Sequence, residues 1–322
     1  MQEFTGIEYL QIDIANNFGM DKLSWEDRLL WFYLHKDNLM DNLDKADNPM
    51  LAAKGLHVWN NPKEATGFIM GLDATASGLQ LLAVLSGCEE TAKAVNLIDT
   101  GKRQDVYSNV VDKMNQTKSM VPVTRKDVKK NVMTHYYNSS TTENLDTVQE
   151  TVFYKTLDGI FPGPEQVMDV VNDAWGPNNL YHEWTLPDGH VAHVRVTGVD
   201  TYRVDIDELK TQVSYRYERN APSKRFTSLC PNFIHSLDGW VCREMVRRAH
   251  KQGFQLAHIH DSMWAHPNNM NHVRRNYREI LAELCTMPVL SQLIASLTGE
   301  QVIFTPEMDL TDAILASEYA LS

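Results

Sequence analysis

The sequence lacks three features: a long apolar run, a paired-cysteine motif and a secretory leader. A membrane helix needs about 18 or more consecutive apolar residues, and no run in this chain of 322 residues is that long. The first residues have neither a basic nor a strongly apolar stretch, which argues against a signal peptide. No C-x-x-C pair occurs among the four cysteines, Cys88, Cys230, Cys242 and Cys285. We therefore expect reduced thiols in a cytoplasmic protein with no membrane partner.

The chain also lacks internal repeats, low-complexity tracts and an excess of positive charge. Its net charge of -12 at pH 7 argues against a protein that coats nucleic acid by itself. Residues 101–130 differ from the rest, because eight Lys or Arg stand there against three Asp. Such a run is typical of a solvated helix face. A patch that faces phosphate groups has the same composition, so both interpretations stay open.

What the sequence does contain is a helix-rich α+β pattern. Apolar residues recur with helical spacing in six stretches, residues 24–45, 77–85, 103–115, 124–137, 139–158 and 232–251. Ser24 and Thr124 are expected to cap two of these helices. Alternating polarity predicts a β-hairpin within residues 180–205, turning at 187–189. Residues 216–225 have the composition of a basic, polar loop.

Residues 256–266, LAHIHDSMWAH, hold three histidines and one carboxylate among apolar neighbours. In an extended strand, His258 and His260 would share one face, as two zinc ligands do, although zinc would need further ligands. A turn at His260, Asp261 and Ser262 is also favoured and would put one carboxylate at a hairpin tip, where it could hold magnesium. A structural hairpin, a zinc site and a magnesium carboxylate all stay open for this segment alone.

A second isolated carboxylate, Asp73, follows the short apolar run of residues 67–72, which suits a buried strand. A buried carboxylate without a partner is unfavourable, so Asp73 could cap the helix expected over residues 77–85. It could instead bind magnesium, which prefers oxygen ligands and often takes only one or two carboxylates. Two Asp residues from two strand ends would suit phosphoryl transfer with two metal ions.

The helix expected over residues 124–137 carries Arg125, Lys129, Met133 and Tyr137 at intervals of four. This spacing places them on one helix face. The set suits a nucleoside triphosphate along the helix, with its phosphates on the two cations and its base beside the aromatic ring. An exposed amphipathic helix is the alternative that the spacing leaves open.

Together these segments resemble the single-subunit RNA polymerases of phages and mitochondria. LDATASGLQ (residues 72–80) is similar to that family's motif A, TRKDVKKNVMTHYYNS (124–139) to motif B, and IHDS (259–262) to motif C. Further segments match in the same order: AVNLI, QDVYSNVV, WTLPDG, PNFIHSLDG and LASEYALS. The resemblance covers nearly the whole chain. Ser262 favours the RNA polymerases over family A DNA polymerases, whose motif C is usually His-Asp-Glu.

The resemblance implies a metal and phosphate role for five residues. Asp73 and Asp261 would bind two catalytic Mg²⁺ ions, with the Ala74 carbonyl as a further ligand. Arg125 and Lys129 would hold the triphosphate of the incoming NTP, and Lys129 is a candidate for protonating the leaving group. Ala74 departs from the family's usual Asp-Gly in motif A.

The other implied roles concern the sugar, the base and the primer. Tyr137 stands where the family has its ribose-selecting and translocation-gating tyrosine, and Met133 would lie with it on the NTP-binding face. His235 would contact the nascent base pair or the ribose, and His260 would support the primer end. Asn138 replaces the glycine that usually follows this tyrosine; Asn can also adopt positive φ at a helix end.

The resemblance further implies a right-hand polymerase architecture. It assigns residues 1–89 to the first part of the palm, 90–234 to the fingers, and 235–322 to the second part of the palm with a C-terminal foot. The thumb, the N-terminal domain and the family's Asp-x-x-Gly-Arg motif are not found in this sequence. Either the sequence is a fragment of a longer polymerase, or the enzyme is split into two polypeptides. We expect the second, a heterodimer with a second polypeptide that carries these parts. Split polymerases of this kind occur in N4-like (schitovirus) phages, which would place the chain in the cytoplasm of an infected bacterium.

The expected function is that of a DNA-directed RNA polymerase catalytic subunit. It would be a nucleotidyltransferase that adds nucleotides from NTPs to an RNA 3′-end on a DNA template, with magnesium. A recruitment factor that binds single-stranded DNA is a further candidate partner. Two alternatives come from other classes: a catalytically weak, polymerase-like scaffold that binds nucleic acid, and a metallohydrolase built on His258 and His260.

Overall fold

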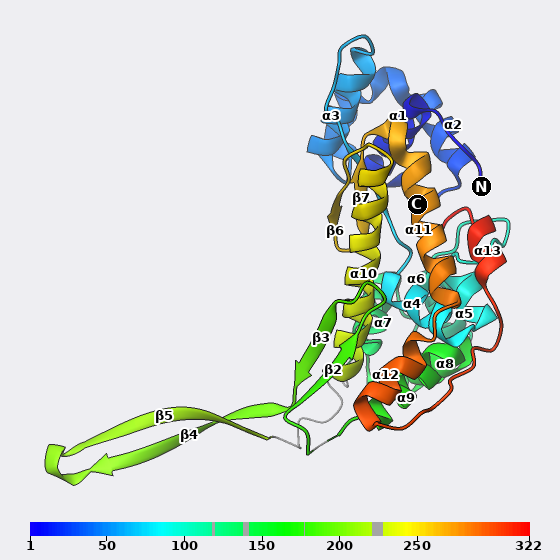
Figure 1. Cartoon of the computed structure of the whole chain (residues 1–322). Coiled ribbons are helices and arrows are strands. Elements are labelled where there is room, and N and C mark those ends of the chain that lie inside the picture. Colours follow the sequence, from blue (N-terminus) through cyan, green and yellow to red (C-terminus); the bar gives the residue numbers. More distant parts are fainter. Residues whose placement is uncertain (118–119, 138–141, 177, 221–227) are drawn as a thin grey trace.

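The computed structural model describes the chain apart from residues 118–119, 138–141, 177 and 221–227. Its helices form an elongated body from which one long hairpin projects (Figure 1). The helices of the described residues are α1 Gly6–Ala15, α2 Trp25–His35, α3 Pro49–Asn60, α4 Ser77–Ser86, α5 Glu89–Ala94, α6 Val106–Met114, α7 Arg125–His135, α8 Thr147–Ile160, α9 Pro162–Asp173, α10 Leu229–Lys251, α11 Met270–Cys285, α12 Val289–Thr298 and α13 Thr311–Ala316. The expected helix-rich α+β class is confirmed.

The strands are short except in the projecting hairpin. They are β1 Met70–Asp73, β2 Tyr181–Thr185, β3 Val191–Arg195, β4 Thr197–Ile206, β5 Thr211–Asn220, β6 Ala257–Ile259 and β7 Ser262–Ala265. They form one sheet in the order β1-β7-β6 and two separate hairpins, β2-β3 and β4-β5. The described part of the chain therefore has no large sheet, and helices supply most of its core.

Two predicted helix starts are confirmed by their caps. The Ser24 side chain accepts a hydrogen bond from the Asp27 backbone N–H, and α2 begins at the next residue. At α7, the Asp127 carboxylate accepts hydrogen bonds from the Thr124 backbone N–H at 2.9 Å and hydroxyl at 2.6 Å. An N-terminal carboxylate also interacts favourably with the helix dipole. The Thr124–Asp127 cap determines where α7 starts, and with it the direction of the helix face that carries Arg125 and Lys129.

Other predicted ends shift. The helical pattern of residues 24–45 is continuous only to His35, and short 3₁₀ turns follow it. The helix expected over residues 139–158 begins at Thr147, where the Asp146 side chain accepts from two backbone N–H groups. The first of its expected residues, 139–141, lie outside the described part of the chain.

The small sheet determines the geometry of the site. β1 and β7 are antiparallel, with Asp73 opposite Ser262 and Gly71 opposite Trp264. β6 and β7 are joined by a tight turn formed by His260 and Asp261. The strands predicted around this turn are therefore confirmed, and residues nearly 190 positions apart in the sequence meet there.

Gly71 lets β1 approach the side chain of its neighbour. A Cβ atom at this position would lie 2.5 Å from Cε2 of Trp264. No real side chain tolerates that distance, so the Trp264 ring takes the space that any other residue would need. The register of β1 against β7 thus depends on a glycine.

A buried arginine joins the two ends of the chain to the body. Arg274 on α11 is 2% exposed and donates hydrogen bonds to the Gln2 carbonyl at 2.9 Å and the Tyr9 hydroxyl at 3.0 Å. It also donates to the Glu318 carbonyl at 3.0 Å and carboxylate at 3.1 Å. A buried charge is tolerated only with such partners. Arg274 therefore holds the C-terminal segment close to α1 and α11.

The β2–β3 hairpin confirms the one predicted within residues 180–205, including its turn near Asp188. The Asp188 carboxylate accepts from Arg243 of α10 at 2.6 Å, which ties this hairpin to the body. The prediction of a loop over residues 216–225 is wrong up to Asn220, because β5 pairs with β4 along its whole length. Residues 221–225 lie outside the described part.

Among the described residues no single helix is long and apolar enough to cross a membrane. The bent pair Pro267–Cys285 and Val289–Thr298 meets the length and composition criteria only when its two helices are taken together. Both helices bury their apolar side chains in the core.

The division into palm and fingers stays a prediction. Its first boundary, after residue 89, falls at the start of α5, and its second, after residue 234, falls inside α10. α10 and α11 lie side by side along the body (Figure 1). A domain division at residue 235 would therefore pass through a continuous helix.

Replacing Gly71 by alanine tests the role of this close contact. We expect Gly71→Ala to destabilise the fold by about 1–3 kcal/mol, since Trp264 has to move. Gly67→Ala is the matched control, because a Cβ there meets nothing within 4 Å, and its effect should stay within about 0.5 kcal/mol. Thermal unfolding measures both. Equal losses of stability would contradict this account of the β1–β7 register.

Candidate active site

A pocket opens where β1, α6, α7 and the β6–β7 turn meet. The predicted site residues line it with two exceptions, His235 and His260. The lining residues are Asp21, Lys22, Asp73, Ala74, Thr75, Ala76, Ser77, Gly78, Leu79, Arg103, Gln104, Asp105, Val106, Tyr107, Arg125, Lys129, Val132, Met133, Tyr136, Tyr137, Asp261 and Ser322. The fold thus brings six separate sequence segments into one cavity, and the three motif segments are among them.

One wall of the pocket is acidic. Asp73 is the last residue of β1, and the Ala74 backbone N–H donates to the Asp261 carbonyl at 3.1 Å. Burial raises the pKa of Asp261, and the negative charges of Asp238 and Asp73 raise it further. Asp73 does not cap the following helix, because the N-cap position of α4 is Ala76. The capping role considered for Asp73 is therefore wrong.

The turn that carries Asp261 has an unusual backbone. His260 has φ 53°, a left-handed value that His adopts more readily than most residues but still at a cost. The Cys242 thiol of α10 donates to the His260 carbonyl at 3.2 Å. Contacts from α10 thus support the turn, and His260 itself lies beside the pocket and not in its lining.

The acidic wall fits magnesium. Its side-chain donors are carboxylate oxygens, which Mg²⁺ prefers. No ion pair between described residues joins Asp73 or Asp261 to a Lys or Arg. Burial is the main cause of the raised pKa of Asp261, and the charges of Asp238 and Asp73 add to it; a bound cation would favour the charged carboxylate. The Ala74 carbonyl belongs to the same lining, and its role as a ligand stays a prediction.

The geometry gives no support to a zinc site at the histidines. His258 is exposed on β6, and His260 sits in the turn. Within the described ranges, the group of side chains found close enough to share a metal ion is Cys88, Glu90 and Glu307. It contains neither histidine, so the metallohydrolase alternative lacks a ligand set.

The opposite wall is cationic and comes from α7. Arg125 donates to both carboxylate oxygens of Asp105, at 2.6 and 3.2 Å. Both cations lie over the Tyr107 ring, with its centroid 5.1 Å from Arg125 Cζ and 5.8 Å from Lys129 Nζ. Burial raises the pKa of Tyr107 to about 12, so its hydroxyl is neutral near pH 7. The wall can present positive charge to an anion in the pocket.

The third side of the pocket is aromatic. Tyr137 follows the end of α7, and its ring stacks on His235 of α10 at 4.7 Å with an interplanar angle of 23°. A Cβ added at Gly78 would lie 3.1 Å from the Tyr137 hydroxyl oxygen. His235 therefore reaches the site by supporting Tyr137. Asn138, which replaces the family's glycine, lies outside the described residues.

Comparison with known proteins identifies the family. Residues 2–170 and 183–309 match the DNA-dependent RNA polymerases. The chain belongs to this polymerase family. It is 27% identical to the chloroplastic/mitochondrial DNA-directed RNA polymerase 2B of Nicotiana tabacum, over 98% of this chain and 38% of that protein. It is 26% identical to the mitochondrial DNA-directed RNA polymerase 1 of Arabidopsis thaliana, over 91% of this chain and 36% of that protein. The chain thus spans less than two fifths of these relatives.

The pocket also contains polar residues for which the sequence patterns predicted no role. Arg103, Asp105 and Tyr107 come from the segment around QDVYSNVV, which was matched to the family without any role for its side chains. Asp238 lies outside this lining, one helical turn after His235 in PNFIHSLDG. Its carboxyl interacts with Ser77 of α4, and its charge raises the pKa of Asp261. Only the folded chain places these groups beside the acidic pair.

The C-terminal segment, which includes Ala320 and Ser322, is bonded to the backbone of Asp73 and to α4 beside the pocket. The Ser322 backbone N–H donates to the Asp73 carbonyl at 2.9 Å, and the Arg103 guanidinium donates to the Ser322 hydroxyl at 2.9 Å. Gln80 of α4 donates to the Ala320 carbonyl at 2.9 Å. The match of LASEYALS to the family pointed to this segment. Its backbone pairing with Asp73 was not visible in the sequence.

The repulsion in the acidic wall predicts a stability effect. We expect Asp261→Asn to raise the Tm of the metal-free protein at pH 7 by about 1–3 °C, because it removes a partly buried negative charge. The gain should shrink as the pH falls through the raised pKa of Asp261, since the protonated carboxyl is not repelled. Added Mg²⁺ should stabilise the wild type and not the variant.

Asp169→Asn is the matched control for this experiment. Burial and the neighbouring acids also raise the pKa of Asp169, but on α9 and outside the pocket lining. This variant should respond to Mg²⁺ as the wild type does. An Asp261→Asn protein that Mg²⁺ still stabilises to the same extent would exclude Asp261 as a ligand.

Proposed function

We propose that the chain is the catalytic subunit of a DNA-directed RNA polymerase of the single-subunit type. It would transfer nucleotides from NTPs to the 3′-end of RNA on a DNA template. The observation that carries the proposal is the meeting of an acidic pair, two α7 cations and a stacked tyrosine in one pocket. Membership of the polymerase family supports the same conclusion.

The acidic wall would bind metal ions, and the cationic wall would bind the triphosphate. Asp73 and Asp261 would hold two Mg²⁺ ions, and when bound these ions would activate the RNA 3′-hydroxyl and neutralise the departing pyrophosphate. Arg125 and Lys129 would bind the triphosphate. Arg125 would then exchange its contact with Asp105 for one with a phosphate, which accepts the same bidentate geometry.

The protein's main contribution would be positioning and charge stabilisation. The RNA 3′-hydroxyl would lose its proton to water, and its oxygen would form a bond to the α-phosphorus. The bond from that phosphorus to the oxygen that bridges to the β-phosphorus would break. Lys129 would donate a proton from Nζ to the leaving pyrophosphate oxygen and regain one from water. Tyr137, held by His235, would contact the ribose, with Met133 beside it on the same face, and His260 would support the primer end next to Asp261.

We further propose that the active enzyme contains a second polypeptide. The net charge of this chain supports the proposal, because a charge of -12 is poorly suited to holding a polyanionic template alone. The second polypeptide would supply the thumb, the Asp-x-x-Gly-Arg motif and basic surface. This arrangement would match the split polymerases of N4-like phages, working in the cytoplasm of an infected bacterium with a recruitment factor that binds single-stranded DNA.

Extension of a labelled RNA primer on single-stranded DNA tests the proposal. With NTPs and Mg²⁺, we expect extension when the second polypeptide is co-expressed, and little or none from this chain alone. Asp261→Asn should abolish extension while binding of primed template stays within about twofold of wild type. Full activity of the lone chain would refute the need for a partner. An Asp261→Asn variant as active as wild type would refute the catalytic assignment and favour the scaffold.

The choice of sugar tests Tyr137 separately. Tyr137→Phe keeps the ring that stacks on His235 and removes only the hydroxyl, so the fold and NTP incorporation should change little. Discrimination of NTP against dNTP should fall by about tenfold, the value of one hydrogen bond of ~1 kcal/mol or slightly more. Single-nucleotide extension measures it. Tyr181→Phe, on an exposed strand outside this pocket, should leave discrimination unchanged, and equal effects would sink the assignment.

A further inference from the structure

Arg103 is a cation of the pocket to which the proposed function gives no task. Two other cations of the lining each have an acidic partner: Lys22 pairs with Asp21 at 2.5 Å, and Arg125 pairs with Asp105 at 2.6 Å. Among the described residues, no acid lies within ion-pair distance of Arg103. An arginine that lines a pocket without such a partner is a candidate for binding an anion.

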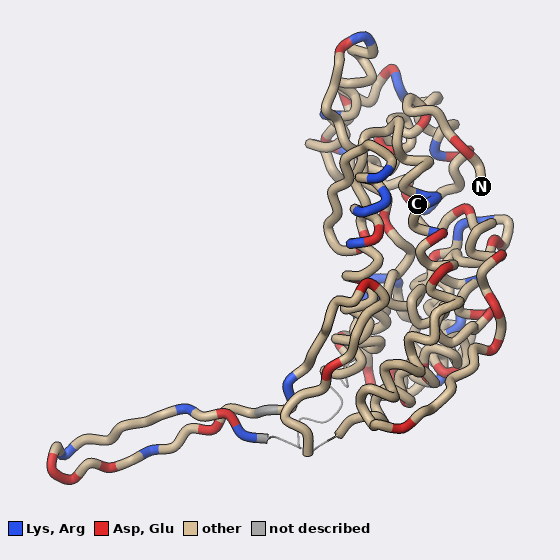
Figure 2. The backbone as a smooth tube through the Cα atoms, viewed as in Figure 1, with Lys and Arg blue, Asp and Glu red and all other residues tan. Residues whose placement is uncertain are grey.

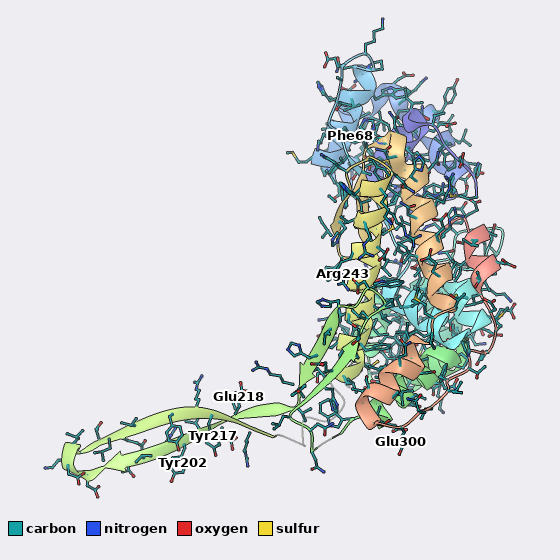
Figure 3. All side chains as sticks on the ribbon, in the orientation of Figure 1. Phe68, Tyr202, Tyr217, Glu218, Arg243 and Glu300 are labelled. Carbon is teal, nitrogen blue, oxygen red and sulfur yellow. The ribbon has the colours of Figure 1, made fainter. Side chains whose placement is uncertain are left out.

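The Arg103 guanidinium keeps most of its donors unused. Its Nε donates to the Ser322 hydroxyl at 2.9 Å, and in the described part of the chain its two terminal nitrogens have no acceptor. Arg243 of α10, labelled in Figure 3, gives the contrast, because it donates to both carboxylate oxygens of Asp188, at 2.6 and 3.2 Å. Since Arg103 lines the pocket, its terminal nitrogens are available to a ligand there.

The backbone next to Arg103 is held in place by a buried amide. The Asn96 side chain accepts a hydrogen bond from the Gln104 backbone N–H at 2.7 Å and donates to the Gln104 carbonyl at 3.0 Å. It also donates to the Thr75 hydroxyl at 3.0 Å, two residues after Asp73. Arg103 therefore extends from a backbone that is fixed beside the acidic wall, so less conformational freedom is lost when it binds a ligand.

The charges around Arg103 come from both walls of the pocket. Burial lowers the pKa of Arg103, the negative charges of Asp21, Asp105 and Asp73 raise it, and the positive charge of Arg125 lowers it. A guanidinium stays charged near pH 7 even so. A partly desolvated charge without an ion pair is unfavourable. An anion bound where the acidic and cationic walls meet would supply the missing partner.

The charge of the whole chain leaves the pocket as the place for such an anion. The net charge is -12, and Figure 2 shows acidic and basic residues interspersed along the body. In the pocket lining, four acids are matched by four cations, Lys22, Arg103, Arg125 and Lys129. Mg²⁺ ions on the acidic wall would make the pocket positive, which favours a multiply charged phosphate chain.

We infer that Arg103 is a further phosphate-binding residue, which holds the pyrophosphate portion of the incoming triphosphate. The inference rests on the proposed function. The α-phosphate has to lie at the metal ions, where the reaction occurs, so a cation between the metal wall and α7 meets the β- and γ-phosphates. Arg103 transfers no proton, because a guanidinium does not deprotonate in this pH range. It stabilises the charge that develops on the departing pyrophosphate.

Binding of inorganic tripolyphosphate to the purified chain tests the inference. This probe has the phosphates of an NTP without its base and sugar, and calorimetric titration in saturating Mg²⁺ measures its Kd. Arg103→Gln should raise the Kd by about tenfold or more, the usual effect of losing a hydrogen bond to a charged group. Arg103→Lys keeps the charge but loses the planar fork, and should raise the Kd by about threefold to fivefold. A Kd within twofold of wild type for both variants would overturn the inference.

Arg243→Gln is the matched control. Arg243 is also a partly buried arginine, but it lies outside the pocket lining and already has Asp188 as its partner. Its substitution should leave the Kd for tripolyphosphate within about twofold of wild type. If Arg243→Gln weakened binding as much as Arg103→Gln, the effect would be one of overall charge, and the assignment of a phosphate contact to Arg103 would be wrong.

Stabilisation by Mg²⁺ alone distinguishes a direct contact from an indirect one. Arg103 bonds to Ser322, and the Ser322 backbone N–H donates to the Asp73 carbonyl, so Arg103 has a route to the metal wall. If it contacts phosphate directly, Mg²⁺ should raise the Tm of Arg103→Gln at least as much as that of wild type. Loss of this stabilisation together with tripolyphosphate binding would mean that Arg103 acts through Asp73, and would refute the contact.

Primer extension by the same proteins separates this inference from the proposed function. In an active enzyme, Arg103→Gln should raise the KM for NTPs by about tenfold. Extension by an enzyme whose tripolyphosphate binding does not depend on Arg103 overturns the inference and leaves the polymerase assignment standing. Binding that depends on Arg103, in a protein that never extends RNA, supports the phosphate contact and counts against the polymerase assignment.

Discussion

The antiparallel pairing of β1 with β7 is the constraint on which the candidate site depends. It sets Asp73 opposite Ser262, so the carboxylate at the end of one strand meets Asp261 in the turn before the other. A slip of one residue would turn every side chain of β1 to the other face. Gly71 beneath Trp264 and the Ser322 pairing with Asp73 both hold this register. The strands are short, so contacts outside the sheet decide its alignment.

Electrostatics gives the pocket its polarity. Acids gather at the strand ends and cations on α7, and the uncharged Tyr107 ring lies against the cations. Burial and, to a smaller extent, the charges of Asp238 and Asp73 raise the pKa of Asp261. Asp105 pairs with Arg125, the side chain proposed to bind phosphate. A site whose charged groups are unfavourable without a ligand and stabilised by a bound ligand is expected where binding energy is used for catalysis.

The helical body and the projecting β4–β5 hairpin are stabilised in different ways. In the body, buried polar groups such as Arg274 and Gln80 are satisfied by backbone carbonyls from distant segments. In the projecting hairpin, the Tyr202 and Tyr215 rings lie 5.5 Å apart, and each side chain is about half exposed. An isolated two-stranded hairpin is only marginally stable in water.

Local sequence was sufficient for α7 and the β6–β7 turn. A Thr-Asp cap and four-residue spacing specify one helix face, and a His-Asp turn between short apolar runs specifies a hairpin tip, because both depend on neighbouring residues. It was insufficient for β5, where charged residues alternating with tyrosines were taken for a loop, since an exposed strand has no buried face to mark it. Arg103, Tyr107 and Asp238 joined the site only in the folded chain. Their places depend on how α6 packs against α7 and how α10 packs against α4, and packing between distant segments leaves no local pattern.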